Sequence, residues 1–124
     1  MARVLALVAD LLFGSRVQGQ LGAAGHDVEL IGDAAGLRRR LADAPAPRAV
    51  LVVDLTDPQL GGARLLEELA REGALAGTRT LGFYSHVDVR ARKRAERAGF
   101  DLLVPRSRMA REGAQLVARL STAP

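Results

Sequence analysis

Five short apolar runs, each separated from the next by a longer segment of helical periodicity, constrain this chain more than any other feature. The predicted strands cover residues 3–9, 27–31, 49–53, 79–84 and 101–104. The run AVLVV at 49–53 is apolar throughout, as in a strand covered on both faces of a parallel sheet, whereas DVELI at 27–31 alternates and indicates an edge position. Regular alternation of strand and helix predicts an α/β domain with five βα units and a parallel sheet.

The apolar residues between these runs recur at helical spacing and predict five helices. The first helix is expected to end at Gly25, the second to be capped by Asp33, and the fourth to cover residues 87–99. The segment APAPR at 44–48 is expected to be a surface connection. The residues predicted to face inward are, helix by helix, Phe13, Val17, Leu21 and Ala24; Ala34, Leu37 and Leu41; Leu65, Leu66 and Leu69; Val87, Ala91, Ala95 and Ala98; and Met109, Leu116, Val117 and Leu120.

Length and composition narrow the class of protein. The composition does not change along the chain, so one domain over residues 1–124 is expected. The absence of cysteine excludes disulfides, thiolate catalysis and cysteine-ligated zinc. No apolar run approaches the roughly 20 residues of a membrane span. The N-terminal apolar run leads into an aspartate and not into a cleavage site, so we interpret it as a strand, and a cytoplasmic location fits.

The charge balance is moderately basic. The net charge is +4, and 17 of the 18 basic residues are arginine, the exception being Lys93. This balance allows nucleic acid or an acidic protein as a partner but requires neither. One tyrosine, three phenylalanines and no tryptophan leave little for base stacking. His26 and His86 belong to no recognisable ligand cluster, so we expect surface or capping roles for them.

Polar residues follow the predicted strands at the edge of the sheet where such folds bind ligands. Asp10 follows the first strand and Asp54 the third, Tyr84 and Ser85 follow the fourth, and Arg106 follows the fifth. Crowded carboxylates attract Mg²⁺, which prefers oxygen ligands. A carboxylate beside Mg²⁺ can act as a nucleophile toward a phosphoryl group, and a nearby cation and hydroxyl would then hold the transferred group.

This arrangement resembles the receiver domain of two-component response regulators. The resemblance covers essentially the whole chain and depends on LVAD (7–10), VVDLTDPQLGG (52–62), AERAGFD (95–101) and the spacing of the five βα units. It implies a flavodoxin-like sheet of order 2-1-3-4-5. It also implies two adjacent acids after the first strand, a phospho-accepting aspartate after the third, a threonine or serine after the fourth and a lysine after the fifth.

The resemblance assigns roles position by position, with three departures. Asp54 falls on the phosphoacceptor position and Asp10 on the second acid, whereas an alanine at position 9 replaces the first acid. Tyr84 falls on the hydroxyl position, with Ser85 one residue later, and Arg106 replaces the lysine. Any Mg²⁺ would therefore depend on Asp10, Asp54 and a carbonyl near residue 56, and losing one carboxylate should weaken such a site.

These departures indicate a degenerate receiver, or pseudo-receiver. The guanidinium of Arg106 can fork onto Asp54 or Asp10 and neutralise the acids without a metal. The expected function is a stand-alone, non-enzymatic signalling module that acts by protein–protein interaction, independently of phosphate and without a cofactor. The alternative is a working phosphoacceptor, in which Asp54 takes phosphate from a histidine kinase or a small phosphodonor with Mg²⁺ bound at Asp10 and Asp54.

A basic run on the fourth predicted helix suggests a partner surface. Its cations are Arg90, Lys93, Arg94 and Arg97. In receivers this helix joins the fifth strand and the fifth helix in contacts with partners and in dimers, so a protein partner or a homodimer is expected there. Two further alternatives stay open: this basic helix binds nucleic acid, and Ser85 forms a capping box with the aspartate three residues later.

Overall fold

The sheet has five parallel strands in the order β2-β1-β3-β4-β5, so the expected order is confirmed. In the computed structural model, which describes residues 2–43 and 49–122, each strand lies within a residue or two of its predicted bounds. The expected surface connection at 44–48 lies outside the described residues. The strands are β1 (Arg3–Leu7), β2 (Asp27–Ile31), β3 (Ala49–Asp54), β4 (Thr78–Tyr84) and β5 (Leu102–Pro105).

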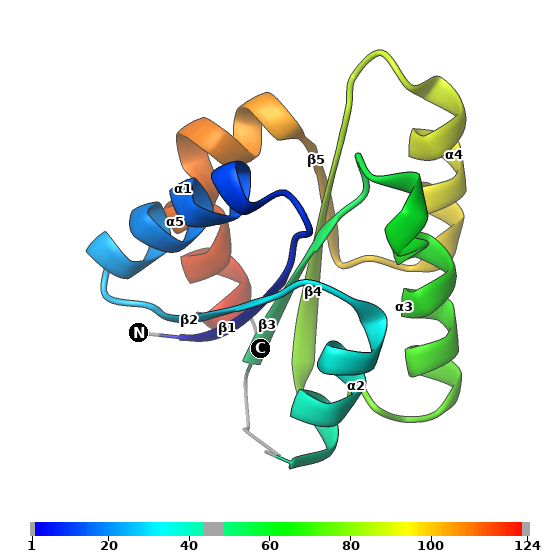
Figure 1. Ribbon diagram of the computed structural model, residues 1–124, viewed down its shortest axis with the longest axis horizontal. Coiled ribbons are helices and arrows are strands. Elements are labelled where there is room, and N and C mark those ends of the chain that lie inside the picture. Colours follow the sequence, from blue (N-terminus) through cyan, green and yellow to red (C-terminus); the bar gives the residue numbers. More distant parts are fainter. Residues whose placement is uncertain (1, 44–48, 123–124) are drawn as a thin grey trace.

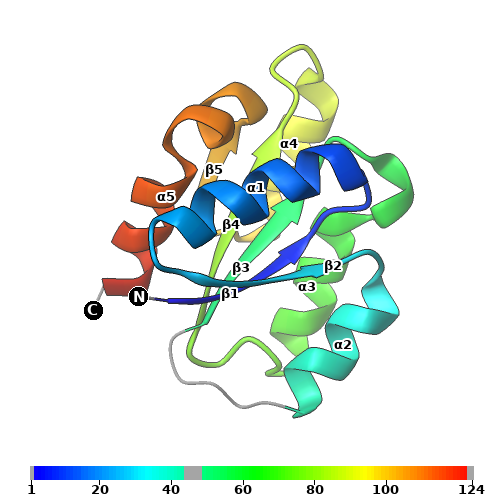
Figure 2. The same cartoon turned by 60° about the vertical axis from the view of Figure 1, so that its left-hand side comes forward.

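The helices cover both faces of the sheet. One face carries α1 and α5, which lie side by side, and the other carries α2, α3 and α4 (Figures 1 and 2). Of the described helices, none combines the length and hydropathy needed to cross a membrane. The helices are α1 (Leu11–Ala23), α2 (Ala34–Asp43), α3 (Gly62–Arg71), α4 (Val89–Ala98) and α5 (Arg106–Thr122), with a short 3₁₀ turn η1 (Pro58–Leu60) before α3.

Strand alternation divides the buried side chains into two cores. In β3 every residue is buried, because successive side chains point to opposite faces and both faces are covered. Val50 and Val52 pack with α1 and α5, whereas Leu51 and Val53 pack with α2 and α3. Because β3 is the central strand, its last residue, Asp54, lies at the middle of the carboxyl edge of the sheet.

Aspartates set the starts of three helices. Asp10 caps α1, and Asp33 accepts a hydrogen bond from the amide of Gly36 at 2.7 Å in α2, as expected. Asp88 caps α4 by accepting a hydrogen bond from the amide of Ala91 at 3.0 Å. The capping box at Ser85 is therefore wrong: α4 starts at Val89, after the aspartate, and the chain before it forms a turn.

Two inward positions predicted for helices are also wrong. Val87 lies before α4 and is 76% exposed, so α4 buries only Ala95 and Ala98. Ala24 is exposed at the C-cap of α1. His26, expected at the surface, is buried, and its Nδ1 accepts a hydrogen bond from the amide of Ala2 at 3.1 Å. This bond satisfies a backbone donor where the chain enters the sheet.

Close packing around Leu55, the residue after Asp54, requires two glycines. A Cβ at Gly62 would lie 2.9 Å from Cδ2 of Leu55 and 2.6 Å from Cγ1 of Val53. A Cβ at Gly82 would lie 2.8 Å from Cδ1 of Leu55 and 2.8 Å from Cδ2 of Leu103. These distances are shorter than ordinary carbon contacts, so a methyl group at either position forces neighbouring side chains to move.

We expect Gly82→Ala to lower the free energy of unfolding by about 1–3 kcal/mol, the usual cost of overpacking a core. The measurement is chemical denaturation followed by circular dichroism. The matched control is Gly19→Ala, in the interior of α1, where no atom lies within 4 Å of the new Cβ. That change should stabilise the protein by about 0.4–1 kcal/mol. Equal effects of the two substitutions would contradict the packing argument.

Candidate functional site

Asp54 ends β3 and is nearly buried, with 3% of its surface exposed. Its Oδ1 accepts hydrogen bonds from the amide and the hydroxyl of Thr56, at 2.8 and 2.6 Å. Its Oδ2 accepts none from a described residue. Since no fully buried polar side-chain atom of the described residues lacks a partner, Oδ2 keeps contact with solvent. One oxygen of Asp54 is thus held by Thr56, and the other has only the slight exposure that a side chain 3% exposed allows.

Asp10 has two separate tasks. Its Oδ1 accepts hydrogen bonds from the amides of Leu12 and Phe13, at 2.9 and 3.2 Å, and so caps α1. Its Oδ2 lies 3.9 Å from Nη2 of Arg106. Both side chains of this pair are about half exposed, so the pair is a loose surface contact.

Arg106, the first residue of α5, does not fork onto Asp54. Its guanidinium carbon lies 4.1 Å from the ring centroid of Phe13, so the charged group stacks on the aromatic face. In the part of the chain that the structure describes, its ion-pair partner is Asp10, and none joins it to Asp54. Of the predicted cluster, Asp10 and Arg106 therefore form an ion pair, and Asp54 is joined to neither of them.

The oxygens left for a cation are few. Each of Asp10 and Asp54 uses one carboxylate oxygen in hydrogen bonds, and the position of the first acid is Ala9, which is exposed. Within residues 2–43 and 49–122 no group of three or more histidine, aspartate or glutamate side chains is arranged to hold a metal ion. The free oxygen of Asp10 lies 3.9 Å from a cation, Arg106. This donor set is a poor fit for Mg²⁺, which needs several oxygen ligands.

The two predicted hydroxyl positions have different surroundings. Tyr84 is the last residue of β4, only 7% exposed, and the guanidinium carbon of Arg92 lies 5.6 Å from its ring centroid. Ser85 is half-buried and lines a hollow together with Thr56 and Arg106. Ser85 therefore lies at this edge of the sheet beside two other hydroxyl residues, Thr56 and Ser107.

This hollow has a volume of about 460 Å³. It lies between the N-terminal part of α1, the start of α5 and the loops after β3 and β4. It is lined by Phe13, Arg16, Thr56, Ser85, His86, Arg106, Ser107 and Ala110. Sequence reasoning missed Arg16 and Ser107. Arg16 lies three residues after Phe13, so helical spacing already placed both on one side of α1.

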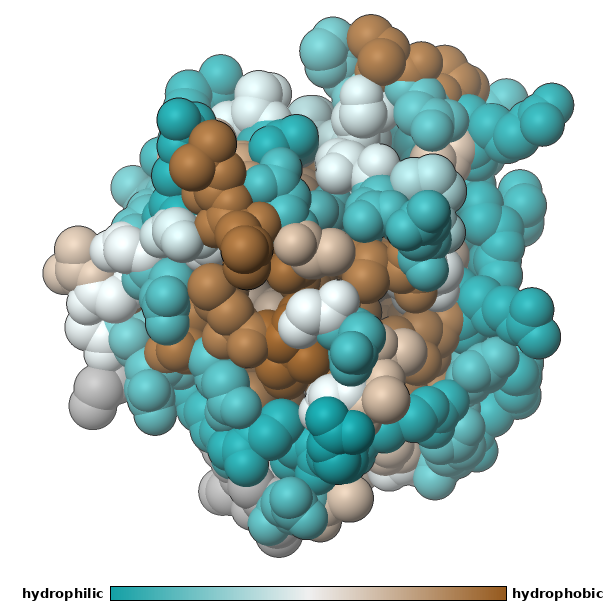
Figure 3. Space-filling model, in the orientation of Figure 1, coloured by the Kyte–Doolittle hydropathy of each residue, from teal (hydrophilic) through white to brown (hydrophobic). Residues whose placement is uncertain are grey.

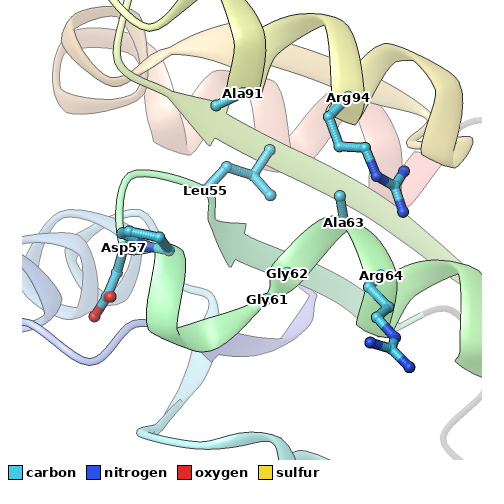
Figure 4. Close-up of a pocket in the computed structure, with 9 residues that line it drawn as sticks. Leu55, Asp57, Gly61, Gly62, Ala63, Arg64, Ala91 and Arg94 are labelled. Carbon is cyan, nitrogen blue, oxygen red and sulfur yellow. The ribbon is translucent and has the colours of Figure 1, made fainter.

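A second, smaller hollow of about 200 Å³ lies between the start of α3 and α4. Figure 4 shows Leu55 between Ala63 of α3 and Ala91 of α4, while the side chain of Asp57 points away. Two alanines and the glycines at 61 and 62 form part of its lining, together with the charged residues Asp57, Arg64 and Arg94. This groove lies next to the side chains that pack around Leu55, and its surface is mainly apolar.

The predicted partner surface on α4 is narrower than its sequence suggests. Arg94 donates two hydrogen bonds to Glu67 of α3, with Nη1 and Oε2 3.0 Å apart, so it ties two helices together. These bonds lower the pKa of the Glu67 carboxyl and raise that of Arg94. Arg90, Lys93 and Arg97 are exposed, and whether they bind a partner stays a prediction.

The architecture just described is that of a response regulator receiver domain. No family model matches the chain, and no curated protein matches it. Among solved structures, the receiver domain of Francisella response regulator 1452 is 17% identical with a TM-score of 0.82, over 98% of this chain and 97% of that one. The signal receiver domain of a signal transduction histidine kinase from Syntrophus aciditrophicus is 17% identical with a TM-score of 0.85, over 98% and 91%.

A third similar structure is the chemotaxis response regulator CheY4 of Vibrio cholerae. It is 18% identical with a TM-score of 0.76, over 94% of this chain and 98% of that one. At such identities the likeness concerns the fold. The expected receiver fold is therefore confirmed, whereas the roles of Asp10, Asp54, Tyr84, Ser85 and Arg106 stay predictions.

We expect the contact between α3 and α4 to weaken in acid. Because the Arg94 hydrogen bonds lower the folded-state pKa of Glu67, this pair stabilises the fold above the ordinary glutamate pKa. The contribution is lost as the pH falls through the lowered value. Amide exchange in α4, corrected for its intrinsic pH dependence, should therefore rise in that range, and Glu67→Gln should reduce the rise, leaving the part due to the Asp88 cap.

The matched control is Glu96→Gln, on α4 itself, whose carboxylate lies 3.8 Å from Arg92. This variant should keep the pH dependence, because its ion pair lies within one helix and not between two. A Glu67→Gln protein with an unchanged acid response would overturn the interpretation.

Proposed function

We propose that residues 1–124 form one receiver-like signalling domain that acts in the cytoplasm through protein contacts, not through phosphate on Asp54. The observation that carries the proposal is the donor set at the carboxyl edge. Ala9 supplies no carboxylate, and Asp10 uses one oxygen to cap α1 while the other makes a loose contact with Arg106. Phosphoryl transfer to an aspartate needs a metal to neutralise the developing charge, and these residues offer a poor site for one. The domain is proposed to be non-enzymatic.

Exposed apolar side chains near this edge support protein contact as the output. Leu11 and Leu12 at the start of α1 are 81% and 72% exposed, and Val87 and Val89 beside α4 are 76% and 58% exposed. Figure 3 shows apolar surface where α1 begins and over the loop between β4 and α4. Large apolar side chains left in water in this way favour a protein partner.

A second candidate function is phosphate acceptance, which one observation favours. Oδ2 of Asp54 accepts no hydrogen bond from a described residue, and Arg106 does not pair with it. A nucleophilic oxygen therefore stands at the acceptor position even though its metal site is incomplete. A histidine kinase would be the partner in that case, and a chemical test separates the two candidates.

The test is intact-mass analysis after incubation with acetyl phosphate and Mg²⁺. We expect no phosphoryl gain by the natural sequence, because the metal is not held. The double variant Ala9→Asp with Arg106→Lys restores the missing acid and replaces the guanidinium, so it should bind Mg²⁺ more tightly and gain phosphate. A gain by the natural sequence that Asp54→Asn abolishes would overturn the proposal in favour of the second candidate.

A further inference from the structure

Lys93 is the only lysine of a chain that otherwise uses arginine for its basic side chains. It lies in the middle of α4 and is exposed. No ion pair joins it to another of the described residues, and Glu96, the acid nearly one turn further along α4, faces Arg92 at 3.8 Å instead. A guanidinium stays protonated in proteins, whereas a lysine amine accepts acyl groups. Lys93 is therefore the one side chain of this sequence that carries an amine nucleophile.

Two exposed arginines lie beside Lys93 on the outer face of α4. Arg90 precedes it by three residues and Arg97 follows it by four, and these spacings make side chains neighbours on a helix. Neither arginine forms an ion pair with a residue that the structure describes. Guanidiniums bind phosphate oxygens through paired hydrogen bonds, and a cluster of like charges raises the local concentration of anions. The surroundings of Lys93 thus favour reagents that carry phosphate.

The orientation of α4 keeps Lys93 on the solvent side. Figure 4 shows Arg94 reaching from α4 toward α3, where it donates two hydrogen bonds to Glu67. Ala95 and Ala98 are buried beneath the helix. Because these three residues hold the inner side of α4, its outer face presents Lys93 to molecules in solution.

We propose that Lys93 is a site of acylation by small donors that carry phosphate, namely acyl phosphates and acyl-coenzyme A thioesters. The lone pair of the unprotonated Nζ attacks the acyl carbon and forms an amide bond. The bond from that carbon to the phosphate oxygen, or to the thioester sulfur, breaks. Phosphate or thiolate leaves, and Nζ releases a proton to water. No group is oxidised or reduced, and the donor is the sole co-reactant.

Acylation changes the charge of the expected partner surface. It removes the positive charge of Lys93, so the exposed cations on the outer face of α4 fall from Arg90, Lys93 and Arg97 to the two arginines. The reaction does not depend on the proposed function, but its meaning as regulation rests on it, because that function assigns the output to protein contacts. An acylated α4 should attract an acidic partner less strongly.

The test is separate incubation of the protein with acetyl phosphate, acetyl-coenzyme A and acetic anhydride, followed by cleavage after glutamate and mass spectrometry. Cleavage at Glu72 and Glu96 releases residues 73–96, in which Lys93 carries the only side-chain amine. The N-terminal amine lies on another peptide and is the internal reference. We expect the ratio of Lys93 to N-terminal acetylation to be higher with the two phosphate-bearing donors than with the uncharged anhydride.

Variants separate attraction of the donor from mere exposure of the amine. Arg90→Gln and Arg97→Gln should each slow acetylation of Lys93 by the phosphate-bearing donors about twofold to fivefold, as expected for the loss of one nearby exposed charge, and leave the anhydride reaction unchanged. Glu96→Gln should speed it, because a negative charge is removed. Arg119→Gln, an equal loss of charge on α5 at the other face of the sheet, should change nothing, and melting curves check that every variant folds.

Three results would overturn the inference. Equal ratios with all three donors would mean that exposure alone explains the reaction, and an Arg119→Gln effect as large as that of Arg90→Gln would mean diffuse charge. The third is absence of acetyl on residues 73–96 when the N-terminal amine has reacted. The proposed function fails by a different sign in the acetyl phosphate sample, because a phosphoryl group on Asp54 differs from acetyl in mass and lies on another peptide.

Discussion

Burial of β3 on both faces is the constraint on which the rest of the structure depends. The apolar side chains of β3 point to both faces of the sheet, so helices must pack on each face to bury them. The parallel strands β1 and β4 on either side form hydrogen bonds with its backbone. The two cores follow from the alternation of its side chains. The same strand carries Asp54 to the carboxyl edge, so the position of the candidate site is a consequence of how the centre of the sheet is buried.

The carboxyl edge of the sheet separates the acidic and basic groups that the receiver resemblance predicts to lie together. Asp54 stands free of Arg106, whose guanidinium stacks on Phe13 and approaches Asp10 instead. The cations Arg16 and Arg106 therefore lie on the α1 and α5 side of the edge, whereas Asp54 is almost buried at the end of β3.

The sequence predicts the fold well because it depends on patterns that the backbone repeats. The strand runs, the edge position of β2 and the cap at Asp33 all follow from local periodicity and capping chemistry. The site is predicted less well because it depends on competition among side chains. The chain alone does not reveal that Phe13 engages Arg106, that Asp88 and not Ser85 begins α4, or that Glu67 engages Arg94.

The small interior face of α4 has a consequence for its stability. Of the described helices, it alone buries no side chain larger than alanine, so hydrophobic burial contributes little to holding it. Its bond to α3 through Arg94 and Glu67 lies at the surface, where dissolved salt screens charges. The order of α4 is thus sensitive to ionic strength, whereas the two cores are not. One helix of this domain responds to the medium around it while the sheet beneath stays fixed.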